Sequence, residues 1–155
     1  MLAQFASDIL LVEDDAYDVE LALAALRARE ISGEFVHVAD GAQFMDSLFF
    51  ANLFTTWHEI KIPKVILLDL NLKTVSGLDV LRQLKADVRA RLIPVVVFTS
   101  SPREVEIAES YALGVNSYVL KPSDAEEYMR VVGDIANYWL NINQWRRTHL
   151  NRAEA

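Results

Sequence analysis

The chain has 155 residues, 52% of them hydrophobic, which predicts a single folded domain and excludes a disordered protein. It contains no cysteine and carries a net charge of −7, so disulfide and thiolate chemistry are excluded and direct binding to nucleic acid is disfavoured. The amino terminus lacks the basic stretch of a signal peptide, and no apolar run approaches the roughly 20 residues that span a bilayer, so we expect a cytoplasmic protein without membrane contact.

Strands and helices are predicted to alternate along the chain. Runs rich in Val, Ile and Leu indicate strands at 8–12, 34–38, 64–69, 93–99 and 117–120. Helical patterns follow them at 15–30, 40–50, 76–88, 102–112 and 124–144. This order predicts an α/β fold with a doubly wound, five-stranded parallel sheet in the order 2-1-3-4-5, because each crossover must be right-handed.

Short signals predict where several helices begin and end. Ser101 and Ser123 each stand three residues before a glutamate, which is the spacing of a capping box, and Ser76 stands three residues before an aspartate. Gly33 and Gly114 follow helical segments, where a residue in the left-handed conformation is favoured. We therefore expect three serine caps and two glycine stops.

Polar side chains stand where the predicted strands end. They are Glu13, Asp14 and Asp15 after the first strand, Asp69 after the third, Thr99 and Ser100 after the fourth, and Lys121 after the fifth. In open α/β sheets, ligands bind beyond the carboxyl ends of the strands, near the point where the strand order reverses. Strands 1 and 3 are neighbours about 5 Å apart in the predicted order, so their acidic ends should converge.

Converging carboxylates repel one another and raise at least one pKa. Mg²⁺ relieves that repulsion, because one or two carboxylates hold it and it readily takes a phosphate oxygen. An aspartate beside Mg²⁺, a hydroxyl and a lysine has the groups needed to form an aspartyl-phosphate. Taken singly, Asp15 is more typical of a helix N-cap and Asp69 of a turn, while Thr99 and Lys121 indicate nothing; only the combination predicts a site.

Four segments resemble the receiver domain of two-component response regulators. They are LLVEDD (10–15), VILLDLNLKTVSG (65–77), VVVFTSS (95–101) and GVNSYVLKP (114–122). The resemblance covers about residues 8–143 and implies the same fold. We expect a receiver domain with an extended last helix over 1–145 and a tail over 146–155. Because no effector segment follows, we expect a stand-alone regulator that acts through protein contacts.

The resemblance implies that Asp69 accepts a phosphoryl group from a sensor histidine kinase. Asp14 and Asp69 would bind Mg²⁺ directly, and Glu13 would act through a water molecule. Asn71 would offer its backbone carbonyl to the metal. The protein would not be an enzyme, since it would only take up the phosphoryl group and slowly hydrolyse it.

The resemblance also implies a switch. Thr99 would hydrogen-bond one phosphoryl oxygen, and Lys121 would pair with another. Tyr118 matches the aromatic residue that turns inward as Thr99 shifts toward the phosphate, although alone it would be an ordinary edge-strand aromatic. The bond from Lys121 to Pro122 is commonly cis in such proteins. Lys73 stands where the family usually has a proline, which leaves the stiffness of that loop open.

The last predicted helix carries two apolar stripes. Tyr128, Val132, Ile135, Trp139 and Ile142 form one, and Val131, Tyr138 and Trp145 form the other. One stripe should cover the sheet, which leaves the second as an interface, unless both belong to one broad buried face. We expect a homodimer through helix 102–112, strand 117–120 and helix 124–144, with contacts from Val131, Ile135, Tyr138, Trp139, Ile142 and Trp145. This helix and the NLKTVSG loop are similar to regulators paired with phytochrome-type histidine kinases.

Other classes of function fit less well. An aspartate-dependent phosphatase would need a second aspartate two residues after the nucleophile, where this chain has Asn71. A flavodoxin-like cofactor binder would need a loop rich in glycine, serine or threonine after the first strand, where EDDAYD (13–18) would repel phosphate. A receiver-like interaction module that works without phosphorylation remains the alternative.

Overall fold

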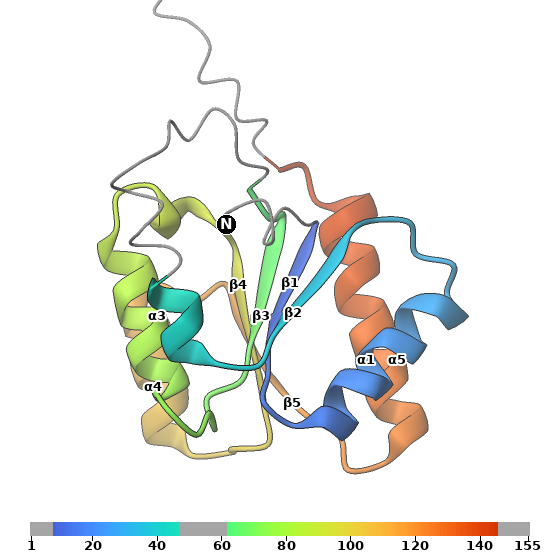
Figure 1. The fold of residues 1–155 in the computed structure, drawn as a ribbon, viewed down its shortest axis with the longest axis horizontal. Coiled ribbons are helices and arrows are strands. Elements are labelled where there is room, and N and C mark those ends of the chain that lie inside the picture. The colour runs from blue at the N-terminus through green and yellow to red at the C-terminus, as the bar shows by residue number, and fades with distance from the viewer. Residues whose placement is uncertain (1–7, 47–61, 146–155) are drawn as a thin grey trace, which may run out of the picture.

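In the computed structural model, which describes residues 8–46 and 62–145, five parallel strands form one sheet between two layers of helices (Figure 1). The strands are β1 (Ile9–Val12), β2 (Phe35–Val38), β3 (Val65–Leu68), β4 (Val95–Thr99) and β5 (Ser117–Leu120). Their order in the sheet is β2-β1-β3-β4-β5. The predicted doubly wound α/β fold is confirmed, and each strand lies within its predicted range.

Helices cover both faces of this sheet. They are α1 (Ala16–Ala28), α3 (Gly77–Ala86), α4 (Glu104–Leu113) and α5 (Ala125–Asn137), with a 3-10 turn η3 (Ala90–Leu92) and a π-helix η4 (Tyr138–Ile142). α1 and α5 lie on one face, and α3 and α4 lie on the other (Figure 1). Residues 41–46 are helical, as predicted, but the rest of the 40–50 prediction and the tail at 146–155 lie outside the described residues. Within the described ranges, no helix is both long and apolar enough to cross a membrane.

The three inner strands are buried on both faces, because their side chains alternate between two cores. Leu10, Ile66 and Val97 point into the core that α3 closes. The other core lies under α1 and α5 and contains their neighbours along the strands, among them Leu11, Leu67 and Phe98. Burial from both sides explains the continuous Val, Ile and Leu runs.

The strand register sets where the polar residues fall. Val12 pairs with Leu68, and Leu68 pairs with Val97. The residues that follow β1 and β3, Glu13 and Asp69, therefore leave the sheet at the same level. The inner strands form a rigid base for whatever these side chains do.

Only one of the three predicted serine caps is present. Ser76 caps α3 as expected, accepting a hydrogen bond from the N–H of Asp79 at 3.1 Å. The cap of α5 is Asp124 and not Ser123, with a bond of 2.9 Å from the N–H of Glu127. α4 begins at Glu104 without a side-chain cap, so the predicted Ser101 cap is wrong.

Only one of the two predicted glycine stops ends a helix. Gly114 ends α4 with a φ of 96°, in the left-handed region, as predicted. Gly33 does not stop α1, which already ends at Ala28. The left-handed residue there is Glu30, with a φ of 51°.

The predicted last helix is present over 125–142, but its final turn is a π-helix and not an α-helix. α5 ends at Asn137, and the N–H of Asn143 then donates to the carbonyl of Tyr138 at 2.7 Å, five residues back. A π-turn holds an extra residue per turn and so rotates everything after it. Ile142, at the end of the stripe that begins with Tyr128, is 58% exposed and does not reach the core, whereas Tyr128 and Val132 do.

Candidate functional site

Three carboxylates meet at the carboxyl edge of the sheet. Glu13 and Asp14 follow β1, and Asp69 follows β3. Glu13 is 1% exposed and Asp69 is 5% exposed, while Asp14 is half-buried. Each offers a carboxylate oxygen, and these oxygens all lie within 4.8 Å of one another. The structure therefore brings together the acidic residues that the strand order predicted to converge.

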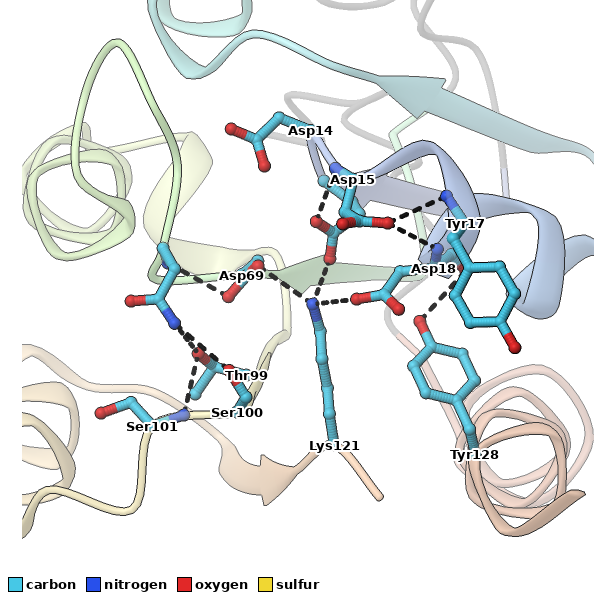
Figure 2. A network of polar contacts seen from close by, with 12 residues as sticks. Asp14, Asp15, Tyr17, Asp18, Asp69, Thr99, Ser100, Ser101, Lys121 and Tyr128 are labelled. Carbon is cyan, nitrogen blue, oxygen red and sulfur yellow. Dashed lines mark hydrogen bonds and ion pairs between the residues drawn. The ribbon is translucent and has the colours of Figure 1, made fainter. Parts of the chain in front are cut away.

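A buried lysine joins these carboxylates. Lys121 follows β5, and its backbone N–H donates to the carbonyl of Thr99 at 2.8 Å. Its ammonium group lies 2.5 Å from Glu13 Oε2 and 3.0 Å from Asp69 Oδ2. The third contact is with Asp18 Oδ2 at 2.7 Å (Figure 2).

Asp18 was missed by the sequence reasoning. It lies in the first turn of α1, where an acidic residue is explained by the helix dipole alone. Asp15 is the N-cap, as predicted, and accepts bonds from the N–H groups of Tyr17 and Asp18 at 2.9 and 3.1 Å. No local pattern in the sequence pairs Asp18 with Lys121, because the two residues stand 103 positions apart.

The electrostatics of the site follow from this arrangement. Burial raises the pKa of Glu13 to about 7, the bond to Lys121 opposes the rise, and the charge of Asp69 adds to it. Burial alone would lower the pKa of Lys121, but the hydrogen bond to Asp18 and the charges of Asp69 and Glu13 outweigh it and raise that pKa. The lysine is therefore charged, and carboxylates outnumber it.

The donor set fits a hard divalent cation. Mg²⁺ prefers oxygen ligands and is usually held by one or two carboxylates together with water. Glu13, Asp14 and Asp69 supply such oxygens, and half-buried Asp14 keeps the cluster open to solvent. Asn71 lies beside them, because its N–H donates to Asp69 Oδ1 at 3.1 Å.

Thr99 and Tyr118 are connected through one residue. Thr99 is buried, and its Oγ1 accepts long bonds from the Asn71 amide at 3.4 Å and from the N–H of Ser101 at 3.5 Å. The Tyr118 hydroxyl donates to the carbonyl of Ser101 at 2.7 Å. The Ser101 hydroxyl bonds to Glu106 of α4, which explains why this serine does not cap the helix.

The loop after Asp69 has Lys73 where the family usually has a proline, and a backbone hydrogen bond from this residue holds the loop. The N–H of Lys73 donates to Asp14 Oδ2 at 2.9 Å, and a proline has no N–H to give. Gly77 brings α3 against the loop, because a Cβ there would lie 2.1 Å from the carbonyl oxygen of Asp69. The peptide bond between Lys121 and Pro122, expected to be cis, is trans.

The predicted interface residues divide into two groups. Val131, Ile135 and Trp139 are partly buried against the core under α1 and α5. Tyr138, Ile142 and Trp145 are exposed. The ammonium of Lys64 lies 5.0 Å from the centre of the Trp145 ring, which holds that ring near the start of β3.

Comparison with known proteins decides the family. The response regulator receiver domain family matches residues 9–132 of this chain. The chain belongs to this family. Its five-stranded fold and the resemblance noted in the sequence agree with the assignment.

Individual members of the family are similar over most of their length. The probable methanogenesis regulatory protein FilR2 of Methanothrix harundinacea is 37% identical over 139 residues, which cover 88% of this chain and 85% of FilR2. Response regulator Rcp1 of Synechocystis sp. is 34% identical over 132 residues, covering 85% and 88% of the two chains.

Solved structures extend the comparison. The Mn²⁺-bound form of Rcp1 superposes with a TM-score of 0.77 at 32% identity, covering 90% of this chain and 98% of Rcp1. The phosphorylated cyanobacterial phytochrome response regulator RcpA gives a TM-score of 0.78 at 33% identity, covering 91% and 99%. This receiver is thus similar to phytochrome-associated response regulators.

Proposed function

We propose that the chain is a stand-alone response regulator that accepts a phosphoryl group on Asp69 from a histidine of a sensor kinase. One observation carries the proposal: the buried Asp69 carboxylate has the Lys121 ammonium 3.0 Å away and two further carboxylates within 4.8 Å. This is a nucleophile surrounded by groups that can hold a cation and a phosphoryl oxygen. The phosphorylated relative RcpA supports the same chemistry.

The transfer exchanges one bond for another. A carboxylate oxygen of Asp69 attacks the phosphorus of a phosphohistidine, the new O–P bond forms, and the P–N bond breaks with its electron pair left on the imidazole. In the slow return, water attacks the phosphorus, the O–P bond breaks, and the Asp69 carboxylate and inorganic phosphate are restored. The chain turns over no other substrate in this scheme and is therefore not an enzyme in the usual sense.

The cation of the proposal is Mg²⁺, which Asp14 and Asp69 would hold directly, with Glu13 acting through water and the backbone carbonyl of Asn71 as a further ligand. When bound, it would neutralise charge on the phosphoryl oxygens. Lys121 pairs with another of these oxygens and excludes water from that side. The oxygen-only donor set and the Mn²⁺-bound relative Rcp1 support a divalent cation.

The proposed switch runs through Ser101. Thr99 moves toward the phosphoryl group and gives up its 3.5 Å bond from the N–H of Ser101. Because Tyr118 is bonded to the carbonyl of the same residue, the β4–α4 loop carries the change to Tyr118. The face formed by α4, β5 and α5 then reports the modified state.

The proposed partners are a sensor histidine kinase and a second copy of the chain. The similarity to phytochrome response regulators favours a phytochrome-type kinase. The net charge of −7 favours a protein partner over nucleic acid. Exposed apolar side chains at Tyr111, Leu120 and Tyr138 support a homodimer through α4, β5 and the end of α5, with Ile142 and Trp145 at its border.

The test is an intact-mass measurement after incubation with Mg²⁺ and a small phosphodonor. We expect the wild type and Asp15→Asn to gain about 80 Da, one phosphoryl group, and Asp69→Asn to gain nothing. A wild type that gains no mass but still dimerises would favour the interaction module that works without phosphorylation. Sizing the same samples tests the dimer, which Tyr138→Glu should weaken, and a wild-type monomer in both states would remove it.

A further inference from the structure

We propose that Asp18 competes with Asp69 for Lys121 and thereby sets how tightly the site holds a phosphoryl group. The inference rests on the proposed function of Asp69. It concerns a residue outside the acidic cluster of Glu13, Asp14 and Asp69. Asp18 acts through Lys121 and is thus a positioning residue.

The hydrogen bonds of Lys121 are fully committed. An ammonium group has three N–H donors. These contact Glu13 at 2.5 Å, Asp18 at 2.7 Å and Asp69 at 3.0 Å, so Asp18 lies nearer to the ammonium than the phosphoacceptor does (Figure 2). A phosphoryl oxygen on Asp69 must therefore share this lysine with a fixed carboxylate.

Asp18 is held in place from two sides. Its N–H donates to the Asp15 carboxylate at 3.1 Å. Its carbonyl accepts the hydroxyl of Tyr128 at 3.1 Å, and Tyr128 is a buried residue of α5 whose ring centre lies 5.1 Å from that of Phe98. These two bonds fix the backbone of Asp18 and so keep its carboxylate within reach of Lys121, which places the competition in the packing of α1 on α5.

The charge of Asp18 should act in opposite directions on two ligands. Three carboxylates contact the single ammonium of Lys121, and a fourth, that of Asp14, lies within 4.8 Å of those of Glu13 and Asp69. This excess of negative charge favours a divalent cation and opposes a phosphoryl dianion. Removing the Asp18 charge frees Lys121 for the phosphoryl group and also leaves the lysine charge less compensated near the cation ligands. A loss of structure alone would weaken both kinds of binding.

The experiment compares full-length wild type, Asp18→Asn, Asp15→Asn and Tyr128→Phe by calorimetry. The first titration uses Mg²⁺ alone, and the second uses beryllofluoride, a phosphoryl mimic, at saturating Mg²⁺. For Asp18→Asn we expect the Kd for Mg²⁺ to rise about threefold and the Kd for beryllofluoride to fall about fivefold to tenfold. Tyr128→Phe should shift both constants in the same directions by less, because Asp18 then loses its anchor.

Asp15→Asn is the matched control, since it removes a carboxylate from the same loop, keeps the helix cap and does not contact Lys121. It should leave both constants within about twofold of wild type. The inference is overturned if Asp18→Asn behaves like Asp15→Asn, or if both of its constants worsen. If Asp18→Asn does not fold, Tyr128→Phe decides by the same criterion. A wild type that binds neither ligand and takes up no phosphoryl group sinks the proposed function itself.

Discussion

The two helices α5 and α4 cover opposite faces of the sheet (Figure 1). They differ in how much of their surface is packed against it. α5 buries Tyr128, Val132, Gly133 and Ala136. α4 buries only Ser110 among its side chains, and it exposes 68% of Val105 and 52% of Tyr111. The layer of α1 and α5 is thus a well-packed support, whereas α4 has little apolar packing to hold it in one position.

The site is divided along the same line. Lys121 is held by Asp18 of α1, and Asp18 is held by Tyr128 of α5. Thr99 and Tyr118 are instead connected through Ser101, which leads into α4. α4 is tied to α3 by an ion pair of Arg82 with Glu109 at 2.6 Å, and an exposed pair of this kind stabilises little. The packed layer of α1 and α5 suits chemistry that needs fixed groups, and the loosely packed helix α4 suits a signal that needs movement.

The largest expected effect comes from removing the anchor of the packed layer. Tyr128→Ala should lower the free energy of unfolding by about 3–5 kcal/mol, because it empties a buried aromatic site. Tyr111→Ala on α4 should stay within about 0.5 kcal/mol of wild type. Urea unfolding of both variants measures the difference. Equal losses would show that α5 and α4 are packed alike.

A second substitution tests the point where the α3/α4 layer is close-packed. Gly77→Ala places a Cβ against the Asp69 carbonyl and should cost about 1–3 kcal/mol of unfolding free energy. The displaced Asp69 should also take up phosphoryl groups about tenfold more slowly, because misplacing a reacting group is costly.

The matched control for this substitution is Gly114→Ala. The nearest atom to its new Cβ is Lys85 Cδ at 3.9 Å, so only the φ of 96° opposes the change. It should cost about 1 kcal/mol and leave the rate of phosphoryl uptake unchanged. A Gly77→Ala protein with a wild-type uptake rate would contradict the proposed contact between α3 and the site.

A third substitution loosens α4. Ser101→Ala removes the hydroxyl that bonds to Glu106 but keeps the backbone groups that contact Thr99 and Tyr118. We expect a loss of about 0.5–1.5 kcal/mol and faster amide hydrogen exchange confined to α4. Ser123→Ala, at the predicted cap that α5 does not use, should change neither quantity. Faster exchange spread over α5 as well would break the distinction between the layers.

The smallest expected effect concerns the loop between β3 and α3, which is bonded to Asp14 through Lys73. Lys73→Pro removes the N–H that bonds to Asp14, which lowers the stability of the folded state. Proline also lowers the conformational entropy of the unfolded chain, and this offsets part of the loss. The net change in unfolding free energy should be under about 1 kcal/mol. Lys73→Ala keeps the N–H and serves as the control. Unfolding measurements that put the proline variant well beyond this limit would mean that the bond fixes the whole loop.

The sequence was a good guide to the strands and to the residues that end them. Continuous apolar runs leave few alternatives to buried parallel strands, and the strand order then brings Glu13 to Asp69. The four motifs that resemble response regulators then correctly indicated the family. These features depend on patterns that repeat along a whole element.

Features that depend on contacts between elements were not predictable. Ser101 has the spacing of a cap, but its hydroxyl finds Glu106 and its carbonyl finds Tyr118. The π-helix that begins at Tyr138 breaks a helical pattern that has no break in the sequence. Asp18 looks like a dipole-compensating residue until Lys121, 103 positions later in the chain, is placed beside it.

The strand register also constrains how this protein can change in length over evolution. Leu68 lies opposite both Val12 and Val97. Deleting one residue inside β3 would turn Asp69 to the other face of the sheet, since side chains alternate along a strand. Insertions and deletions that keep the protein functional should therefore accumulate in the connections, while the inner strands keep their lengths even as their apolar residues are exchanged.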